Sequence, residues 1–273
     1  MVATLADIVA ATRQRVEAAK RTADLRALER KAESHAPRRF RRSLEKKAAE
    51  GVAVIAELKK ASPSRGTIRG TLHVAAIAPE LERAGAAALS VLTEEQFFHG
   101  DLSDLVEASA ATVLPCLRKD FTVDEFQLLE ARANAADAVL LILSALDDSE
   151  FLRLHQRSRE LGLDALCEVH DENELKRALD LGAEMVGVNN RDLRTFEVDL
   201  ATSQRLAPKI PTSVLRVAES GIQRGDDIRR LRAFGYDAFL VGESLMRADN
   251  PGAELARMLA EAADVPPVVK RVM

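Results

Sequence analysis

The stretch Val54-Ile-Ala-Glu-Leu-Lys-Lys-Ala-Ser-Pro-Ser-Arg-Gly66 joins an apolar run to charged residues and then to turn-forming residues. The run from Gly51 to Ile55 predicts a buried strand, because it is short, continuous and apolar. The Ser-Pro-Ser-Arg-Gly segment predicts a loop. Glu57, Lys59 and Lys60 stand between strand and loop. A strand that brings an acid and two bases to its carboxyl end is suited to present charge at the mouth of a site.

The rest of the chain repeats the pattern of an apolar strand followed by a helix. The predicted strands are Val52–Glu57, Ala87–Leu92, Thr112–Cys116, Ala138–Leu143, Ala165–Val169, Met185–Asn189, Val214–Ala218 and Ala238–Val241. The predicted helices are His73–Ala84, Leu102–Ser109, Val123–Ala133, Asp148–Leu161, Asp171–Leu181, Ala201–Leu206, Asp226–Phe234 and Ala253–Ala263. Eight such units predict an α/β fold, a single (β/α)8 barrel, since apolar strands of this kind form a parallel sheet that helices cover. An open doubly wound sheet is the alternative, and the number of units weighs against it.

Glycines support the predicted helix ends. Gly85, Gly162, Gly182 and Gly235 each follow a predicted helix and precede a predicted strand. A glycine in this position closes a helix in the left-handed conformation at the lowest steric cost. The helices therefore end where the strand pattern resumes.

A helical segment precedes the barrel pattern. Helical spacing of apolar residues covers residues 3–19, and residues 24–33 and 43–49 are predicted helices too. We divide the chain into a helical extension, residues 1–50, and a barrel, residues 51–273, within one structural domain. The extension either caps one end of the barrel or decorates its surface.

Composition excludes several classes of protein. The 273 residues fit one barrel with a short extension, and the net charge of −4, from 39 Lys and Arg against 43 Asp and Glu, argues against a nucleic-acid-binding protein. The basic run Arg38-Arg-Phe-Arg-Arg42 is interpreted as a solvated helix face or connector. The sequence has neither a signal-peptide pattern nor an apolar run of about 18 residues, so we expect a cytoplasmic protein without a membrane partner.

The cysteines and histidines give no sign of a metal site. Cys116 and Cys167 lie in apolar runs and are predicted to be reduced and buried. The five histidines show no metal-ligand spacing, so we predict no metal. We interpret His99 and His170 as loop residues.

Polar residues stand at the carboxyl ends of most predicted strands. They are Glu57 and Lys59, Thr93 and Glu94, Arg118 to Phe121, Glu168, Asn189 to Asp192, Glu219 to Gly221, and Gly242 to Ser244. Reactive groups of (β/α)8 barrels lie at this edge, so these residues would share one pocket. Acids and lysines held together shift one another's pKa values, as proton-transfer chemistry requires. Lys59 and Lys119 could instead be rim lysines paired with Glu57 and Asp120.

Two of these strand ends contain a glycine turn. The segments are Ala218-Glu-Ser-Gly-Ile222 and Leu240-Val-Gly-Glu-Ser244. Backbone N–H groups in such turns hold phosphate after the last two strands of many barrels. Any tight turn can explain one glycine, but the pair predicts a phosphorylated ligand.

Six segments at the strand ends form an ordered set. They are Ile55-Ala-Glu-Leu-Lys-Lys-Ala-Ser-Pro-Ser-Arg-Gly66, Ser90-Val-Leu-Thr-Glu94, Leu117-Arg-Lys-Asp-Phe121, Cys167-Glu-Val-His170, Gly187-Val-Asn-Asn-Arg-Asp-Leu193 and Ala218-Glu-Ser-Gly-Ile222. Together they resemble the indole-3-glycerol-phosphate synthase family, and the resemblance extends from Leu5 to about Leu259. The resemblance implies conversion of 1-(2-carboxyphenylamino)-1-deoxyribulose 5-phosphate to indole-3-glycerol phosphate, with loss of CO2 and water. It implies no cofactor and a role in tryptophan biosynthesis.

The resemblance also implies roles for individual residues. Lys119 would be the general acid of ring closure, and Glu168 would act as base or acid in dehydration. The other implied catalytic residues are Glu57, Lys59, Asn189 and Glu219. The implied substrate- and phosphate-binding residues are Ser62, Phe98, Phe121, Arg191, Ser220, Gly221, Gly242 and Glu243.

The chain departs from the family pattern at two places. Some members place a Trp of the extension against the substrate, whereas this chain has no Trp, so we expect Leu5 or Ile8 to supply that contact. Some members have Ser in place of Glu243. A carboxylate would repel phosphate, so we expect that of Glu243 to point away from it. We expect a monomer or weak homodimer, although helix faces that pack on a barrel and on a partner look alike.

Two rival functions remain open at this point. Phosphoribosylanthranilate isomerase and tryptophan synthase α-type lyases share the phosphate turns but lack the segment around Glu57, Lys59 and Ser62. A non-catalytic barrel that binds phosphorylated metabolites is the rival from another class. The presence of Lys119 and Glu168 weighs against it.

Overall fold

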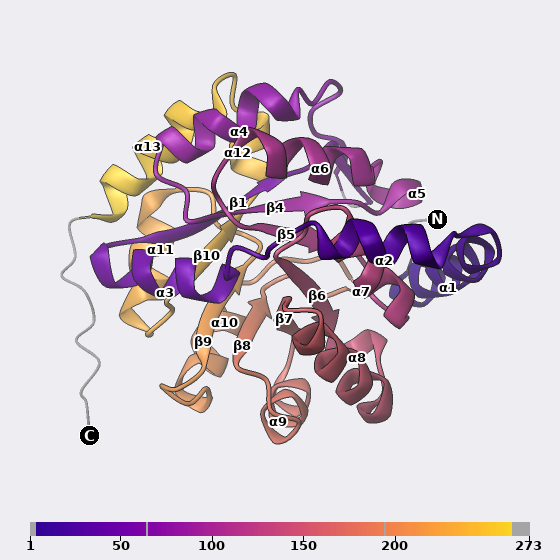
Figure 1. The fold of residues 1–273 in the computed structure, drawn as a ribbon. Coiled ribbons are helices and arrows are strands. Elements are labelled where there is room, and N and C mark those ends of the chain that lie inside the picture. The colour runs from indigo at the N-terminus through magenta and orange to yellow at the C-terminus, as the bar shows by residue number, and fades with distance from the viewer. Residues whose placement is uncertain (1–3, 64, 194, 264–273) are drawn as a thin grey trace.

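Eight parallel strands close into a barrel in the order β1-β10-β9-β8-β7-β6-β5-β4 (Figure 1). The structure is a computed structural model that describes residues 4–63, 65–193 and 195–263. The barrel strands are β1 (Ala53–Leu58), β4 (Ala88–Leu92), β5 (Cys116–Lys119), β6 (Ala138–Ile142), β7 (Asp164–Val169), β8 (Met185–Asn189), β9 (Leu215–Glu219) and β10 (Ala238–Val241). The predicted (β/α)8 barrel is therefore confirmed.

Helices follow the strands and cover the outside of the barrel. They are α4 (Val74–Arg83), α6 (Leu102–Ala111), α7 (Glu125–Ala133), α8 (Asp148–Glu160), α9 (Glu172–Asp180), α10 (Ala201–Leu206), α11 (Gly225–Ala233) and α13 (Pro251–Ala262). The four predicted closing glycines all have positive φ, between 71° and 103°. Short elements that the sequence did not predict are β2 (Ala61–Ser62), β3 (Gly66–Thr67), α5 (Glu95–Phe98), α12 (Glu243–Arg247) and the 3-10 turns η1 (Leu143–Ala145) and η2 (Ala207–Lys209).

One predicted strand is wrong over most of its length. The prediction placed it at Thr112–Cys116, whereas β5 begins at Cys116. Pro115 has no N–H and cannot donate to a strand ladder, and only its carbonyl contributes, by accepting from the Leu89 N–H at 2.9 Å. Val113 is 78% exposed. An apolar loop was thus mistaken for the start of the strand.

The alternation of side chains along each strand decides what reaches the carboxyl end of the barrel. In β1, Ala53 and Ile55 pack inside the barrel, whereas Val54 and Ala56 pack against the surrounding helices. Since side chains alternate between faces, Glu57 faces inward one step above Ile55. The same step leads from Leu117 to Lys119, from Leu166 to Glu168 and from Val217 to Glu219.

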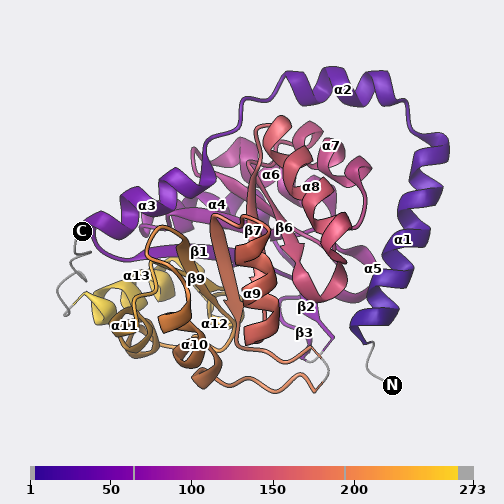
Figure 2. The ribbon, with the colours of Figure 1, turned by 90° about the horizontal axis from the view of Figure 1, so that it is seen from below.

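The helices before the barrel contact it at both ends. They are α1 (Leu5–Thr22), α2 (Leu25–Glu33) and α3 (Phe40–Glu50); residue 3 of the first predicted helix lies outside the described residues. Figure 2 shows α2 beside α7 and α1 beside α5. The helix α3 lies at the amino end of the barrel, where Ser43 Oγ donates to the Ala87 carbonyl at 2.8 Å and the Arg41 N–H donates to Asp164 Oδ2 at 2.9 Å.

A fully buried carboxylate fixes this amino end. Asp137 Oδ1 accepts from the Arg38 N–H at 2.7 Å, and Oδ2 accepts from Arg38 Nε at 3.0 Å and the Cys116 N–H at 2.6 Å. His35 Nε2 lies 3.0 Å from Oδ1. Arg38 lies in the connector between α2 and α3, which is one of the two interpretations of the Arg38–Arg42 run, but its side chain is bound to Asp137 rather than solvated. Cys116 and Cys167 are buried and free, as predicted.

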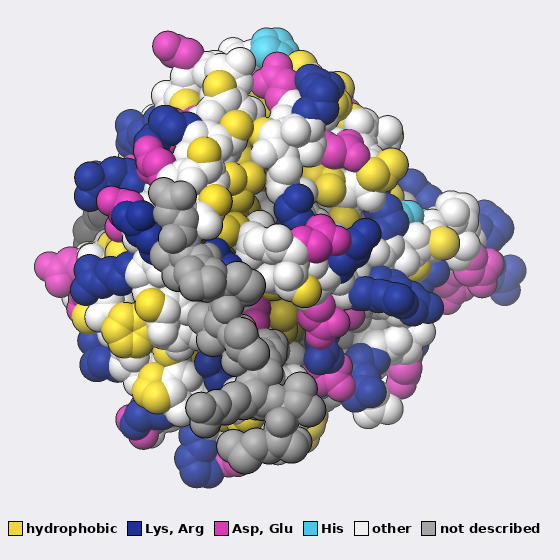
Figure 3. Space-filling view, turned by 90° about the vertical axis from the view of Figure 1, so that its left-hand side faces the viewer, with side chains coloured by type: hydrophobic (Ala, Val, Ile, Leu, Met, Phe, Trp, Pro, Cys, Tyr) yellow, Lys and Arg dark blue, Asp and Glu magenta, His cyan; other side chains and the backbone are white. Residues whose placement is uncertain are grey.

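The surface carries mixed charge. Figure 3 shows basic and acidic side chains interspersed over one face of the molecule, rather than gathered by sign. Among the described residues, no helix combines the length and apolar character needed to cross a bilayer.

Candidate active site

A pocket at the carboxyl end of the barrel brings all the predicted site residues together. Its lining includes Glu57, Lys59, Ser62, Phe98, Lys119, Phe121, Glu168, Asn189, Arg191, Glu219, Ser220, Gly221, Gly242 and Glu243. They come from strand ends and from the loops after them, because the alternation described above turns the last inward position of several strands toward this mouth.

Lys119 lies between two carboxylates. Its Nζ donates to Glu168 Oε2 at 2.9 Å and lies 3.5 Å from Glu219 Oε2. Burial alone would lower the pKa of Lys119, but Glu168, Glu219 and Glu57 raise that pKa above its ordinary value. Lys119 is therefore held in its charged form, with its side chain only 14% exposed. The alternative in which it is a rim lysine paired with Asp120 is wrong.

The pKa values of the two carboxylates beside Lys119 shift in opposite directions. Burial opposes ionisation of Glu168, yet Lys119 and His170 hold the pKa of Glu168 below its ordinary value. Burial raises the pKa of Glu219 to about 8, Lys119 opposes this, and the charges of Glu168 and Glu57 add to it. Glu219 Oε1 is also buried and has no hydrogen-bond partner among the residues that the structure describes. Carboxylates whose pKa values diverge in one site can serve as separate acid and base.

Two glycines make room for these acids. A Cβ at Gly187 in β8 would fall inside contact distance of Glu219 Oε1, and a Cβ at Gly242 would do the same to Glu57 Oε1. Glycine inside a strand commonly marks such a close approach. Gly187 was not among the predicted site residues, and its position inside an apolar strand was the available signal.

The remaining polar residues of the pocket are paired with one another. Lys59 Nζ lies 2.6 Å from Glu57 Oε1. Asn189 Nδ2 donates to Glu168 Oε1 at 3.1 Å, and Asn189 Oδ1 accepts from the Arg191 N–H at 3.0 Å. These contacts orient Glu57 and Glu168 before any ligand arrives.

The turn after β9 has a left-handed backbone. Ser220 has φ 64° and Gly221 has φ 81°, and a Cβ at Gly221 would lie 2.6 Å from Val198 Cγ1. The Asn190 side chain holds the turn by donating to the carbonyls of Glu219 at 2.9 Å and Ser220 at 3.2 Å. A fixed turn of this kind can aim backbone N–H groups at an anion.

Arginines engage the carboxylate of Glu243 at the pocket's edge. Arg65 Nε lies 3.4 Å away, Arg247 Nε donates at 3.2 Å, and Arg191 Nη2 lies at 3.9 Å. The negative charge of Glu243 is thereby offset where phosphate is expected.

Aromatic and aliphatic side chains form the other wall. The rings of Phe98 and Phe121 lie 6.0 Å apart between centroids, and Leu5 and Ile8 of α1 line the same pocket. Both residues expected to stand in for the missing Trp therefore face the site.

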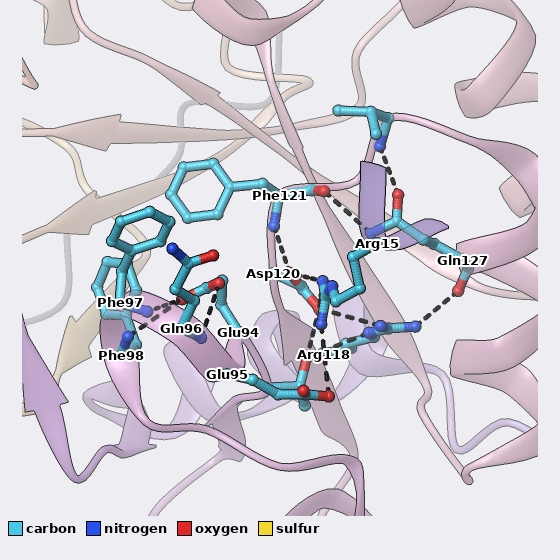
Figure 4. A network of polar contacts seen from close by, with 12 residues as sticks. Arg15, Glu94, Glu95, Gln96, Phe97, Phe98, Arg118, Asp120, Phe121 and Gln127 are labelled. Carbon is cyan, nitrogen blue, oxygen red and sulfur yellow. Dashed lines mark hydrogen bonds and ion pairs between the residues drawn. The ribbon is translucent and has the colours of Figure 1, made fainter. Parts of the chain in front are cut away.

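A charged network joins α1 to this wall (Figure 4). Arg15 Nη2 donates to Asp120 Oδ1 at 3.3 Å, and Arg15 Nη1 lies 3.7 Å from Glu95 Oε1 in α5. Arg118 Nη2 donates to Asp120 Oδ2 at 3.0 Å. Asp120 follows Lys119 in the chain, so Arg15 fixes α1 to the loop beside Lys119.

His170 is a second residue that the sequence did not assign to the site. It lies in the loop between β7 and α9, as interpreted, but its side chain is only 13% exposed and lies 3.3 Å from Glu168 Oε1. The signal was its spacing of two from Glu168, which favours the same face of the chain. Over residues 4–63, 65–193 and 195–263, no group of three or more His, Cys, Asp or Glu side chains is arranged to hold a metal ion.

Comparisons with known proteins agree with the geometry. The family model described as "Indole-3-glycerol phosphate synthase" matches residues 5–258. A curated protein of that name from Koribacter versatilis (strain Ellin345) is 54% identical over 259 residues, covering 95% of this chain and 100% of its own. A relative of the same name from Burkholderia ambifaria (strain MC40-6) is 50% identical over 252 residues, covering 92% of this chain and 97% of its own.

Solved structures of lower identity share the fold alone. The 3-hexulose-6-phosphate synthase from Salmonella typhimurium aligns with a TM-score of 0.63 at 12% identity, covering 77% of this chain and 98% of its own. The tryptophan synthase alpha chain from Legionella pneumophila subsp. pneumophila aligns with a TM-score of 0.61 at 12% identity, covering 85% and 100%. The family match and the curated relatives, which span nearly the whole chain, carry the assignment: the chain belongs to the indole-3-glycerol phosphate synthase family.

Proposed function

We propose that the chain converts 1-(2-carboxyphenylamino)-1-deoxyribulose 5-phosphate to indole-3-glycerol phosphate, CO2 and water, as a carboxy-lyase of tryptophan biosynthesis. The observation that carries the proposal is Lys119, buried between Glu168 and Glu219 at the mouth of the barrel. The reaction needs a proton donor at a ketose carbonyl and a separate acceptor nearby, and this group supplies both.

Ring closure begins at Lys119. Its ammonium donates a proton to the carbonyl oxygen of the ribulose chain while the ring carbon that bears the carboxylate attacks the carbonyl carbon. The new C–C bond leaves a positive charge that is shared by the aromatic ring and the nitrogen attached to it. Loss of CO2 returns its bonding electrons to that system and neutralises the charge.

Dehydration follows and completes the indole ring. The hydroxyl formed at the former carbonyl leaves as water after it takes a proton, and Glu168 accepts the proton lost from the neighbouring carbon. The low pKa of Glu168, which Lys119 and His170 hold down against the effect of burial, suits this role as base. Asn189 orients Glu168 through the 3.1 Å hydrogen bond.

Binding falls to the rim of the pocket. Ser62, Gly242 and the turn at Ser220 and Gly221 are placed to hold phosphate through hydroxyl and backbone N–H groups, with Arg191 at the edge. Phe98 and Phe121 would contact the anthranilate ring. Lys59, with its partner Glu57, is placed to hold the substrate carboxylate or phosphate and completes the catalytic group.

A fluorescence assay tests the function. The purified chain is mixed with the carboxyphenylamino substrate, and indole fluorescence is followed; the absence of Trp keeps the protein background low. We expect steady product formation. Tight binding of the substrate without product would instead support the non-catalytic barrel, and turnover of phosphoribosylanthranilate would support the isomerase.

The setting of the enzyme is part of the same proposal. We propose a cytoplasmic enzyme that acts without a cofactor on a phosphorylated small molecule. We further propose that the chain is a monomer or weak homodimer, and that residues 1–50 form a helical extension to the barrel of residues 51–273. Sedimentation at several concentrations tests the oligomeric state.

A further inference from the structure

A largely buried histidine lies beside Glu168, a residue of the active-site pocket. His170 lies just after β7, with Nε2 3.3 Å from Glu168 Oε1 and Nδ1 3.0 Å from Glu174 Oε2. Glu174, on α9, also accepts from the His170 backbone N–H at 2.8 Å. The imidazole is therefore fixed by Glu174 and directed at Glu168.

The three groups lead outward from the pocket. The side chain of Glu168 is 2% exposed, that of His170 is 13% exposed and that of Glu174 is 16% exposed. His170 Nε2 is fully buried, and no partner is aligned with it for a hydrogen bond among the residues that the structure describes. A buried polar atom without an aligned partner is costly. At a site of proton transfer such contacts often tighten only when substrate binds.

The electrostatic environment keeps the imidazole charged. Burial opposes the charge, but Glu168 and Glu174 raise the pKa of His170 to about 10. Among the residues that the structure describes, the charged groups paired with the ring are these two carboxylates, one on β7 and one on α9. Both ring nitrogens therefore carry protons at neutral pH, so a proton can leave on one side while another enters on the other.

The proposed reaction requires such a supply. Ring closure forms one C–C bond, decarboxylation breaks one C–C bond and dehydration breaks one C–O bond. The substrate carboxylate leaves as neutral CO2, and the carbonyl oxygen leaves as water. One proton goes to that oxygen in ring closure, a second goes to the departing hydroxyl, and one returns from carbon. Each turnover therefore takes up one proton from solvent, although Lys119 and Glu168 are buried.

We propose that His170 is a positioning residue for Glu168 and that, with Glu174, it carries this proton from solvent into the pocket. The path runs from water to Glu174, through His170 Nδ1 and Nε2, to Glu168 and then to Lys119, which lies 2.9 Å from Glu168. The inference rests on the proposed function, since it explains how the acid of that reaction is reprotonated.

Substitution of the two outer groups tests the path. In His170→Gln an amide can still donate to Glu168, but it holds no charge and relays no proton. We expect kcat to fall by about a hundredfold, the lower end of the effects of general acid–base catalysis, with little change in KM. Without the imidazolium the pKa of Glu168 rises, so the acid limb of the kcat–pH profile moves to higher pH. Glu174→Gln should also lower kcat.

The double variant and a distant histidine make the test specific. Because His170 and Glu174 belong to one path, the double variant should be no slower than His170→Gln alone. The matched control is His35→Gln at the amino end of the barrel, where His35 Nε2 lies 3.0 Å from the buried carboxylate of Asp137. The kcat–pH profile of this variant should match that of the wild type. Circular dichroism confirms that each variant is folded.

Three results would overturn the path. The first is a wild-type kcat and kcat–pH profile in His170→Gln, and the second is a double variant in which the two losses of kcat multiply. The third is a fall in kcat that follows a loss of stability while the limbs of the kcat–pH profile stay in place. Failure of the underlying function is a separate result, because the wild-type chain itself would then form no product.

Discussion

Single atoms decide how the acids of the pocket are placed. Glu219 occupies space that is open only because residue 187 has no side chain, and its raised pKa follows from burial beside Glu168 and Glu57. A small displacement of the Glu219 carboxylate would change the distance between its Oε2 and Lys119 Nζ, which is 3.5 Å. The chemistry of Glu219 therefore depends on a residue that carries no functional group.

The variant Gly187→Ala tests this dependence. The added methyl group must displace the Glu219 carboxylate, so kcat should fall by about a hundredfold, as expected when a reacting group is misplaced by about 1 Å. Steady-state kinetics with circular dichroism measures it. The control is Gly70→Ala, whose Cβ would meet only Thr67 at an ordinary 3.9 Å. Unchanged kcat in Gly187→Ala would show that the position of Glu219 is unimportant.

The helix α1 belongs functionally to the carboxyl end of the barrel. It contributes Leu5 and Ile8 to the pocket, and Arg15 holds it against Asp120, beside Lys119, and against α5, which carries Phe98. Arg13 attaches the same helix to Glu150 at 2.8 Å, on α8. Of these two arginines, Arg15 contacts the segments that line the site, whereas Arg13 contacts α8.

The pair Arg15→Ala and Arg13→Ala separates these contacts. Arg15→Ala should raise KM about tenfold, the size of one charge-assisted hydrogen bond, because α1 and the Phe98 wall lose their common attachment. Arg13→Ala removes an exposed pair of small energetic value and should leave KM unchanged. Equal effects on KM in both variants would contradict a specific role for Arg15.

In the whole molecule, the two ends of the barrel have different roles. The carboxyl end holds the reactive groups, and the amino end is fixed by α3 and by the buried Asp137. In barrels of this kind the amino end contributes stability rather than chemistry. Changes at Asp137 should therefore act on unfolding and leave catalysis intact.

We expect Asp137→Ala to lower the free energy of unfolding by about 3 kcal/mol, because buried donors lose a charged partner, while kcat and KM stay unchanged. Urea unfolding and kinetics measure the two effects. Burial raises the pKa of Asp137, but hydrogen bonds from His35 and Arg38 outweigh it and lower that pKa below its ordinary value. Its contribution is therefore present above about pH 4 and is lost as pH falls through the lower folded value. A stability difference that grows on acidification would contradict this sign.

The sequence predicted most of the barrel because each strand carries a local pattern, an apolar run that ends in polar residues. The step of two from Ile55 to Glu57 and from Leu166 to Glu168 is visible without a structure. The start of β5 was not, since Val113 and Leu114 are apolar although they form a loop. Gly187 was missed because its importance arises from the approach of Glu219 on the neighbouring strand β9, which only the fold brings about. His170 was missed although Glu168 and Glu174 stand two and four residues away in the chain, because spacing alone does not show whether a loop histidine turns toward such neighbours.

The central claim is that Lys119 donates the proton for ring closure. It is tested by kcat in Lys119→Ala, beside the affinity of the same variant for a substrate analogue whose ketone is reduced to an alcohol. The account predicts a fall in kcat of about a hundredfold or more, with binding of the analogue largely retained. Turnover that survives the substitution would contradict the claim and make Lys59 the acid to examine.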